Sequence, residues 1–279
     1  MIQQTGDLPD GLSDPFILYL MKQIKSFFLL FLCLWTVAFA DAKKKTEVIA
    51  HRGYWKCEGS AQNSIASLKG AKAVGAFGSE FDVHLTKDGV PIVFHDDTVQ
   101  GKPIHTSAYD ELRDLKLPNG EAVPVLRNYL LEAGRQEGLW LVVEVKAHGT
   151  PSRDREAARR AVEEVNRQGL DKRTDYITFS REAGSELIRL APENDVYYLN
   201  GDLSPEELKN LGYAGLDYPY KVMQKHPEWF DEAHRLGLKV NVWTVDDPLV
   251  LEEMVKNGAD FITTNYPEEA LEIVRSLVP

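Results

Sequence analysis

The stretch that decides the fold is EFDVHLTKDGVPIVFHD, residues 80–96. It contains two strand-like runs, Glu80–His84 and Pro91–His95, which lie close together in the chain. A crossover between parallel strands needs about a dozen residues or more, and the gap here is far shorter. Asp88-Gly89 is a two-residue hairpin signal. The stretch therefore predicts that Pro91–His95 folds back antiparallel on Glu80–His84.

The predicted hairpin also places side chains. With a two-residue turn, Asp82 lies directly opposite His95, at about 5 Å between Cβ atoms. A carboxylate and a histidine side by side can form part of a site. The segment that follows, Asp97–Val123, is predicted to be a short insertion that caps this site.

Outward from the hairpin, apolar, β-branched runs alternate with helical patterns, which indicates an α/β fold with parallel strands. With the returning hairpin strand set aside, the remaining runs number eight, as in a TIM (β/α)8 barrel. An open, doubly wound sheet is the weaker alternative, since no Gly-rich phosphate fingerprint follows the first run. The runs other than Glu80–His84 are Val48–His51, Leu141–Lys146, Tyr176–Ser180, Val196–Asn200, Gly215–Tyr218, Val240–Thr244 and Phe261–Thr264. The clearest helical stretches are Asn63–Ala76, Pro124–Glu137, Arg153–Gln168, Pro227–Leu236 and Pro248–Asn257.

Residues 1–42 predict a leader rather than part of the barrel. Lys22 and Lys25 precede an apolar run over residues 27–38, and small residues up to Ala42 follow it. This order is typical of a secretory signal peptide, with Met21 as the expected start of translation. The run is shorter than the about 20 residues that span a bilayer, so a retained anchor is the weaker alternative.

Cleavage leaves residues 43–279 as one domain, expected in the periplasm or outside the cell without stable membrane insertion. The chain is 43% hydrophobic and 27% charged, which is ordinary for a globular protein. Its net charge of −11 argues against binding nucleic acid through a basic face. Cys33 falls in the leader, so Cys57 alone remains, and no disulfide framework or zinc-type cysteine cluster is expected.

Three carboxylates predict a cation site. Glu80 and Asp82 are two apart on one strand and face the same side, and Glu144 and Lys146 repeat that spacing on the next parallel strand. Like charges in an apolar interior are costly unless a cation lies between them. Carboxylate oxygens favour a hard cation such as Mg²⁺ or Ca²⁺. The alternative is that Glu144 and Lys146 only pair with polar neighbours at a solvated rim.

Two histidines are candidates for proton transfer. His51 ends the first strand, where barrel active sites collect, and is followed by Arg52 and Gly53. Arginine presents a planar fork that suits phosphate oxygens. His95 precedes Asp96, which can orient its ring, and both histidines titrate near neutrality. His84 is expected to lie beside the site, and no role is assigned to the remaining histidines, His105, His148, His226 and His234.

These motifs together resemble the glycerophosphodiester phosphodiesterase family. The resemblance is carried in order by Ala50–Gly53, Glu80–Gly89, Val93–Asp96, Glu144-Val145-Lys146, Val242–Val245 and Gly258–Thr264. It runs from about residue 47 to 275. It implies a TIM barrel that hydrolyses glycerophosphodiesters, small molecules, to glycerol 3-phosphate and an alcohol.

The resemblance also implies roles for individual residues. Glu80, Asp82 and Glu144 would hold one divalent cation, Ca²⁺ or Mg²⁺. His51 and His95 would be the catalytic base and acid, with His51 favoured as the base. Arg52 and Lys146 would bind the phosphate, and Trp243 would line the wall for the alcohol group, although core packing is the alternative for this tryptophan.

Two positions depart from the family pattern. Gln62 stands where the family usually has Glu, and Asn265 replaces the more usual Asp. The expected cation ligands are intact, so these changes concern substrate preference or local charge. Two other functions remain open: a related phospholipase, phosphatidylinositol-specific or sphingomyelinase D-like, and a non-catalytic periplasmic protein that binds phosphodiesters.

Overall fold

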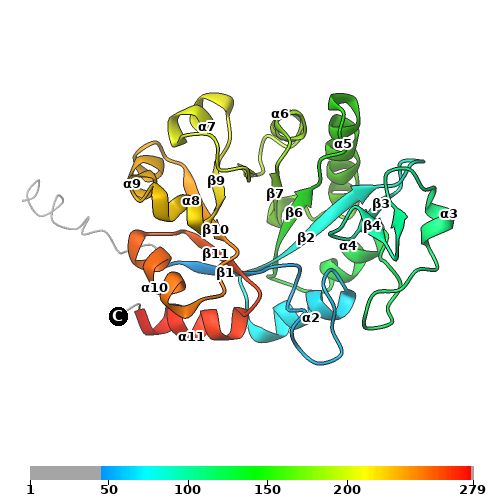
Figure 1. Ribbon diagram of the computed structural model, residues 1–279, viewed down its shortest axis with the longest axis horizontal. Helices are drawn as coiled ribbons and strands as arrows, with labels where there is room; N and C mark the ends of the chain where they lie inside the picture. The colour runs from blue at the N-terminus through cyan, green and yellow to red at the C-terminus, as the bar shows by residue number, and fades with distance from the viewer. Residues whose placement is uncertain (1–44, 278–279) are drawn as a thin grey trace, which may run out of the picture. The chain divides into compact units, whose positions relative to one another are not determined.

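The computed structural model describes residues 45–277. Eight parallel strands form a closed barrel, because β1 pairs with both β2 and β11. The neighbour order is β1-β11-β10-β9-β8-β7-β6-β2 (Figure 1). This closure confirms the predicted TIM barrel and excludes the open sheet. The strands are β1 (Glu47–Ala50), β2 (Gly78–Leu85), β6 (Trp140–Val145), β7 (Thr174–Thr178), β8 (Val196–Tyr198), β9 (Gly215–Pro219), β10 (Lys239–Trp243) and β11 (Phe261–Thr264).

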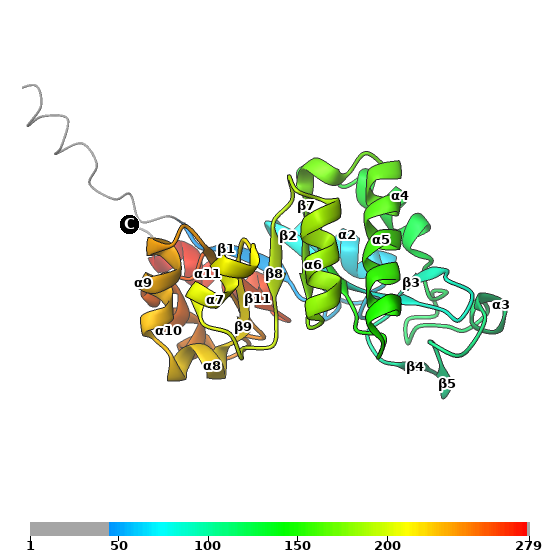
Figure 2. The ribbon, with the colours of Figure 1, turned by 90° about the horizontal axis from the view of Figure 1, so that it is seen from above.

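Helices surround the barrel strands (Figures 1 and 2). Several begin at a side-chain cap that accepts an orphan backbone N–H, as Ser64, Thr150 and Ser180 do. The helices of the ring are α2 (Ile65–Val74), α4 (Leu126–Gly134), α5 (Pro151–Arg167), α6 (Arg181–Leu190), α7 (Pro205–Leu211), α8 (Tyr220–Lys225), α9 (Glu228–Arg235), α10 (Pro248–Asn257) and α11 (Pro267–Leu277), with a 3-10 turn at Asp171–Arg173.

Successive side chains on the barrel strands point alternately outward to the helices and inward to the barrel. On β2, Phe81 and Val83 belong to the large core between strands and helices. Side chains two apart share a face, so Glu80 and Asp82 point the other way, into the barrel. A smaller apolar cluster fills that interior and contains Ile49, Val142, Ile177, Tyr197, Leu199 and Phe261. The acidic residues therefore lie above an apolar floor.

The hairpin exists, but its predicted register is wrong by one residue. β3 (Pro91–Val93) runs antiparallel to β2, and Val83 pairs with Val93 rather than with Phe94. The turn has three residues instead of two: the Thr86 N–H donates to the Val90 carbonyl, and Gly89 adopts a φ of 80°. A turn followed by a left-handed glycine is the usual form of a three-residue hairpin loop. Asp82 is therefore not the strand partner of His95, which lies beyond the end of β3.

The predicted insertion has its own small structure. It contains β4 (Thr98–Val99), β5 (Lys102–Pro103) and the short helix α3 (Tyr109–Leu112). A separate apolar cluster holds it together and includes Ile92, Val99, Ile104, Leu112, Leu117 and Val123. The expected leader, residues 1–42, lies outside the described residues. Within residues 45–277, no helix has the length and apolar character needed to cross a membrane.

Candidate active site

Three carboxylates from neighbouring strands meet at the carboxyl end of the barrel. Oxygens of Glu80, Asp82 and Glu144 lie within 4.8 Å of one another, and all three residues are buried. The parallel register places Asp82 opposite Glu144 on β2 and β6. Oε1 of Glu80 is buried and accepts no hydrogen bond from the described residues. Such a group of oxygens is a potential metal-binding site.

The carboxylates of this cluster lie close enough to change one another's pKa. Burial, followed by the charges of Asp82 and Glu144, holds the pKa of Glu80 well above its usual range. Burial and the charge of Asp82 raise the pKa of Glu144 to about 7. Burial acts in the same direction on Asp82, but Lys146, His95 and Arg52 outweigh it, so the pKa of Asp82 is lowered. A cation between the oxygens would remove this repulsion, so the residues fit a hard divalent ion.

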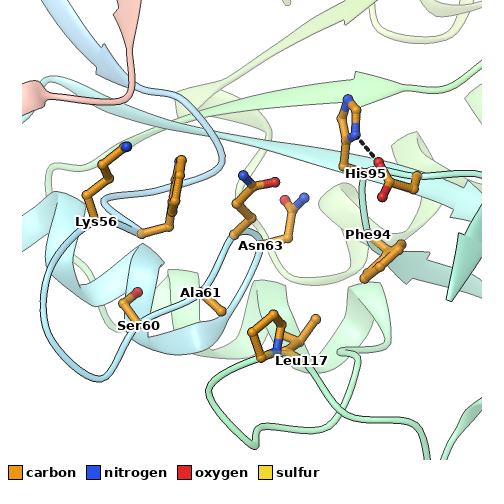
Figure 3. A pocket seen from close by; sticks show the side chains of 11 residues that line it. Lys56, Ser60, Ala61, Asn63, Phe94, His95 and Leu117 are labelled. Carbon is orange, nitrogen blue, oxygen red and sulfur yellow. Dashed lines mark hydrogen bonds and ion pairs between the residues drawn. The ribbon is translucent and has the colours of Figure 1, made fainter. Parts of the chain in front are cut away.

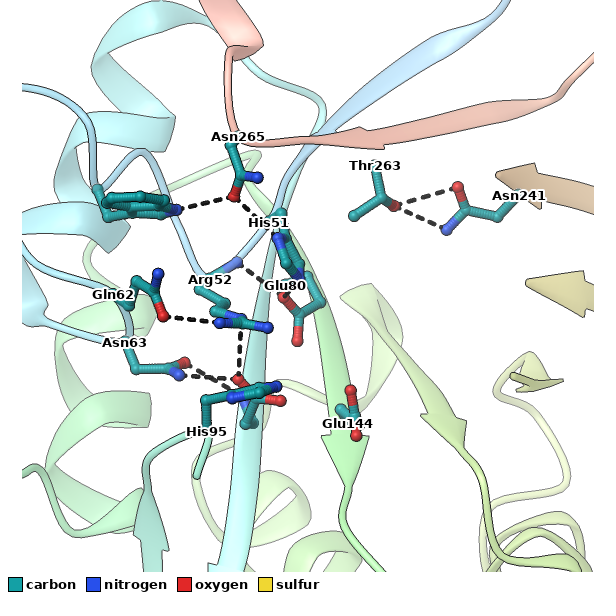
Figure 4. A network of polar contacts seen from close by, with 12 residues as sticks. His51, Arg52, Gln62, Asn63, Glu80, His95, Glu144, Asn241, Thr263 and Asn265 are labelled. Atoms are coloured by element: carbon teal, nitrogen blue, oxygen red, sulfur yellow. Dashed lines mark hydrogen bonds and ion pairs between the residues drawn. The ribbon is translucent and has the colours of Figure 1, made fainter. Parts of the chain in front are cut away.

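His51 has a defined proton arrangement. Its Nδ1 lies 2.9 Å from Oδ1 of Asn265. Asn265 is itself oriented, because its Nδ2 donates to Asp246 at 2.7 Å and the Trp55 indole donates to Oδ1 at 2.9 Å. Oδ1 is therefore the acceptor, and Nδ1 of His51 carries the proton. The bare Nε2 faces Glu80 at 4.0 Å (Figure 4).

Burial, followed by the charge of Arg52, lowers the pKa of His51 to about 4. At neutral pH the ring is uncharged, with a lone pair on Nε2. That is the form of a general base. Asn265, where the family more usually has Asp, thus keeps the contact that orients His51 but carries an amide in place of a negative charge.

His95 reaches the same site from the loop after β3. Its Nδ1 lies 2.6 Å from Oδ1 of Asp96, which orients the ring (Figure 3). Nε2 of His84 donates to the His95 carbonyl at 3.0 Å and so fixes the backbone of this loop. His95 and His51 both line the barrel-mouth cavity. The two predicted proton-transfer groups are therefore brought together despite the changed register.

The two predicted phosphate-binding cations flank the carboxylates. Nε of Arg52 lies 3.7 Å from Asp82 and Nη1 donates to Gln62 at 2.7 Å, so the second departure from the family pattern orients the guanidinium. Lys146 lies 2.8 Å from Glu144 and 3.3 Å from Asp82. Arg52 adopts a left-handed φ of 57°. A Cβ atom added at Gly53 would lie only 2.5 Å from Oγ of Ser67, which is a clash. The tight turn requires this glycine.

Two cavities meet at His95. The barrel-mouth cavity has a volume of about 120 Å³. The second cavity, of about 580 Å³, lies between the β1–α2 loop and the insertion and is lined by residues that include Trp55, Phe94 and Leu117 (Figure 3). His95 lines both. The residues of the barrel-mouth cavity are His51, Arg52, Glu80, His95, Glu144, Lys146, Ile177, Phe179, Leu199, Asp217, Trp243 and Thr263.

Sequence reasoning missed several residues that support the site. Asn63 donates to Asp82 Oδ2 at 2.8 Å and accepts from the Asp82 backbone at 3.1 Å. The position of Asn63 directly after Gln62, in a segment that resembles the family pattern, was the sequence feature that could have revealed it. Asp217 on β9 also lines the barrel-mouth cavity and was not considered. Its burial between apolar strand residues gives no motif by which to find it.

A histidine cluster was also missed, and it joins the insertion to the barrel. Nitrogens of His84, His105 and His148 lie within 4.8 Å of one another. The His84 ring donates from Nε2 to a carbonyl, so its Nδ1 accepts from Nε2 of His105 at 2.9 Å. Nε2 of His148 accepts from the Leu85 N–H at 2.8 Å, so its proton is on Nδ1. Because Nε2 accepts that bond and Nδ1 carries the proton, His148 has no free lone pair for a metal. The three rings form a hydrogen-bonded and stacked cluster.

The fold and site define a class of TIM-barrel enzymes with two histidines, two basic side chains and an acidic cluster at the mouth of the barrel. The Glycerophosphoryl diester phosphodiesterase family profile matches residues 51–269. The chain belongs to this family. That finding confirms the resemblance carried by its sequence motifs.

Relatives and solved structures agree with this assignment. A crystal structure of a glycerophosphodiester phosphodiesterase from Parabacteroides distasonis is 56% identical, with a TM-score of 0.84, and the match covers 85% of this chain and all of that one. An Oleispira antarctica phosphodiesterase, solved with the product sn-glycerol-3-phosphate, is 25% identical, with a TM-score of 0.70, 83% of this chain and 97% of that one covered. A glycerophosphodiester phosphodiesterase of Caldanaerobacter subterraneus is 29% identical over 252 residues, 83% of this chain and 98% of the relative.

Proposed function

We propose that this protein hydrolyses glycerophosphodiesters to glycerol 3-phosphate and an alcohol, using one divalent cation and two histidines. The observation that carries the proposal is the barrel-mouth cavity, where His51 and His95 meet the acidic cluster of Glu80, Asp82 and Glu144. The family and the product complex of the Oleispira relative support the substrate class. The predicted leader supports export as a further part of the proposal.

In the proposed mechanism each residue acts on a defined part of the substrate. Arg52 and Lys146 bind the phosphate oxygens and neutralise their charge. His51 removes a proton from the attacking oxygen through its bare Nε2, and His95 protonates the leaving alkoxide. The attacking oxygen is either water or the neighbouring glycerol hydroxyl, which would form a cyclic phosphate.

The cation would be held by Glu80, Asp82 and Glu144. When bound, it supplies further neutralisation of the phosphodiester charge. The donor set consists of carboxylate oxygens, which both Ca²⁺ and Mg²⁺ accept, so the identity of the ion requires a measurement.

The test is release of glycerol 3-phosphate from glycerophosphocholine, glycerophosphoethanolamine and glycerophosphoinositol, with and without EDTA. We expect release that EDTA stops and that Ca²⁺ or Mg²⁺ restores. His95→Ala should lower kcat at least about 100-fold with an unchanged circular dichroism spectrum. No release from any of the three in the presence of metal would contradict the assignment.

The alternatives differ in the same assay. A phospholipase would cleave lipids that carry acyl chains, but a barrel-mouth cavity of about 120 Å³ leaves little room for a chain. A phosphodiester-binding protein would bind the three substrates without turnover. The two histidines, which suit proton transfer, argue against a function in binding alone.

A further inference from the structure

Asp217 is a buried acid on the far side of the barrel-mouth cavity. It lies on β9 with an exposed fraction of 1%, and it lines the cavity together with Phe179, Leu199 and Trp243. Its Oδ1 is buried and accepts no hydrogen bond from any residue in the range 45–277. Buried polar atoms are nearly always paired, so an unpaired carboxyl oxygen at a cavity wall calls for a partner from outside the chain.

The neighbours of Asp217 leave its Oδ1 without a partner. Asn241 is opposite Asp217 in the register of β9 and β10, and its amide bonds to Thr263, with contacts of 3.0 and 3.1 Å. Figure 4 shows this pair turned toward each other, apart from Arg52 and His95. A side-chain hydrogen bond from Asn241 also acts on the Asp217 carboxyl and opposes the rise of its pKa, but Oδ1 accepts no bond from the described residues. The backbone carbonyl of Asp217 accepts from the Trp243 indole at 2.8 Å, which fixes that wall. Oδ1 of the carboxyl therefore remains available to a ligand.

The occupant beside Asp217 should be neutral and polar. The charge of Glu144 reaches Asp217 and, after burial, is the second cause that raises its pKa well above the usual range. A phosphate group here would meet acidic neighbours, whereas Arg52 and Lys146 offer it a positive environment elsewhere in the cavity. A second cation is also disfavoured, because Asp217 is not among the carboxylates whose oxygens cluster within 4.8 Å.

We propose that Asp217 determines specificity by hydrogen-bonding a free hydroxyl of the substrate's glycerol moiety. This inference rests on the proposed function and deepens it. A carboxyl oxygen accepts a hydrogen bond from a hydroxyl group in either protonation state, so the unpaired Oδ1 complements a hydroxyl of the substrate. The phosphate is then held at Arg52 and Lys146, the carbon chain lies along Phe179, Leu199 and Trp243, and the polyol end meets Asp217. An acylated glycerol has no such hydroxyl to offer at the acylated position.

The test compares two phosphate monoesters that differ in the diol. The affinities of sn-glycerol 3-phosphate and methyl phosphate are measured by calorimetry on the full chain with the restoring cation present. We expect the wild type to prefer glycerol 3-phosphate by about tenfold and Asp217→Ala to lose that preference while its affinity for methyl phosphate stays within about twofold. Asp217→Asn keeps a donor and an acceptor and should retain most of the preference.

Controls separate this inference from folding and from the proposed function. Asp175→Asn replaces a buried acid of β7 that does not line the cavity, and it should leave the preference unchanged. An unchanged preference in Asp217→Ala, or equal loss of affinity for both monoesters, would overturn the inference. Wild-type protein that binds glycerol 3-phosphate selectively but releases none from glycerophosphodiesters would instead refute the proposed function alone.

Discussion

At the scale of single residues, Asn265 shows how a neutral side chain can orient a histidine ring. Its Oδ1 fixes the proton of His51 on Nδ1, and contacts from Trp55 and Asp246 prevent the amide from turning. An aspartate would accept the same hydrogen bond from Nδ1 and add a negative charge. The amide therefore preserves the orientation of the ring, which is what a general base needs first.

Asn265→Ala should lower kcat about tenfold or more with little change in KM, because His51 loses the acceptor that fixes its tautomer. Asn265→Asp restores an acceptor and should retain activity near that of the wild type. Steady-state kinetics with the preferred glycerophosphodiester measure both. A fall in kcat of the same size in both variants would show that the contact does not act through orientation.

The residues named from motifs, apart from His95 in the loop after β3, lie on or directly after barrel strands, because parallel strands bring their carboxyl ends to one edge. Glu80, Asp82 and Glu144 were found by their spacing alone, which period-2 alternation makes reliable. Asp217 was not found, since one acid within a strand has no spacing to reveal it. Its significance depends on an unpaired oxygen, a property of the assembled barrel.

At the scale of elements, the hairpin shows where sequence reasoning reaches its limit. Asp88-Gly89 correctly indicated a turn and an antiparallel return, but it is compatible with two or three loop residues. Because Gly89 adopts a left-handed conformation, the loop has three residues, and the register of the hairpin shifts by one residue. A one-residue shift reverses the face of every side chain in a continuing strand. His95 still enters the site because β3 has already ended.

The insertion contacts the active site through histidines. His105→Ala removes the hydrogen bond to His84 and the stacking on His148, whose ring centroid lies 4.5 Å away. Since His84 holds the backbone of His95, we expect kcat to fall several-fold and residues 97–123 to be cleaved faster in limited proteolysis. His226→Ala, at an exposed ring stacked on Trp229, is the control and should change neither. Unaltered proteolysis and kinetics in His105→Ala would refute the link.

At the scale of the whole molecule, a buried acid should make stability depend on pH. Burial, followed by the charge of Asp195, raises the pKa of Asp175 to about 7, with Lys239 acting in the opposite direction. In the unfolded chain an aspartate titrates near about 4. Between these values the folded state holds a proton that the unfolded state lacks, so stability falls as the pH rises through this window.

Asp175→Asn removes this titration. At pH 8 the variant should unfold several degrees or more above the wild type. A rise of the pKa from about 4 to about 7 corresponds to at most about 4 kcal/mol, and each 1 kcal/mol shifts Tm by about 2–4 °C in a domain of this size. The difference should be mostly lost near pH 4, where the wild-type side chain is protonated in the folded state and about half protonated in the unfolded state. Thermal unfolding by circular dichroism at the two pH values measures this, and a constant difference would contradict it.

The position of His95 between two cavities has a consequence for the order of events. Under the proposed assignment, the glycerol phosphate lies in the smaller space inside the barrel, and the alcohol lies in the larger space beside the insertion. The alcohol can then depart first, while its co-product waits behind the histidine. The kinetic pattern should be that of ordered release, with glycerol 3-phosphate competing against substrate and the alcohol not competing. Turnover would then slow as glycerol 3-phosphate accumulates, because this product occupies the site that the next substrate needs. The enzyme would be inhibited by its own phosphorylated product.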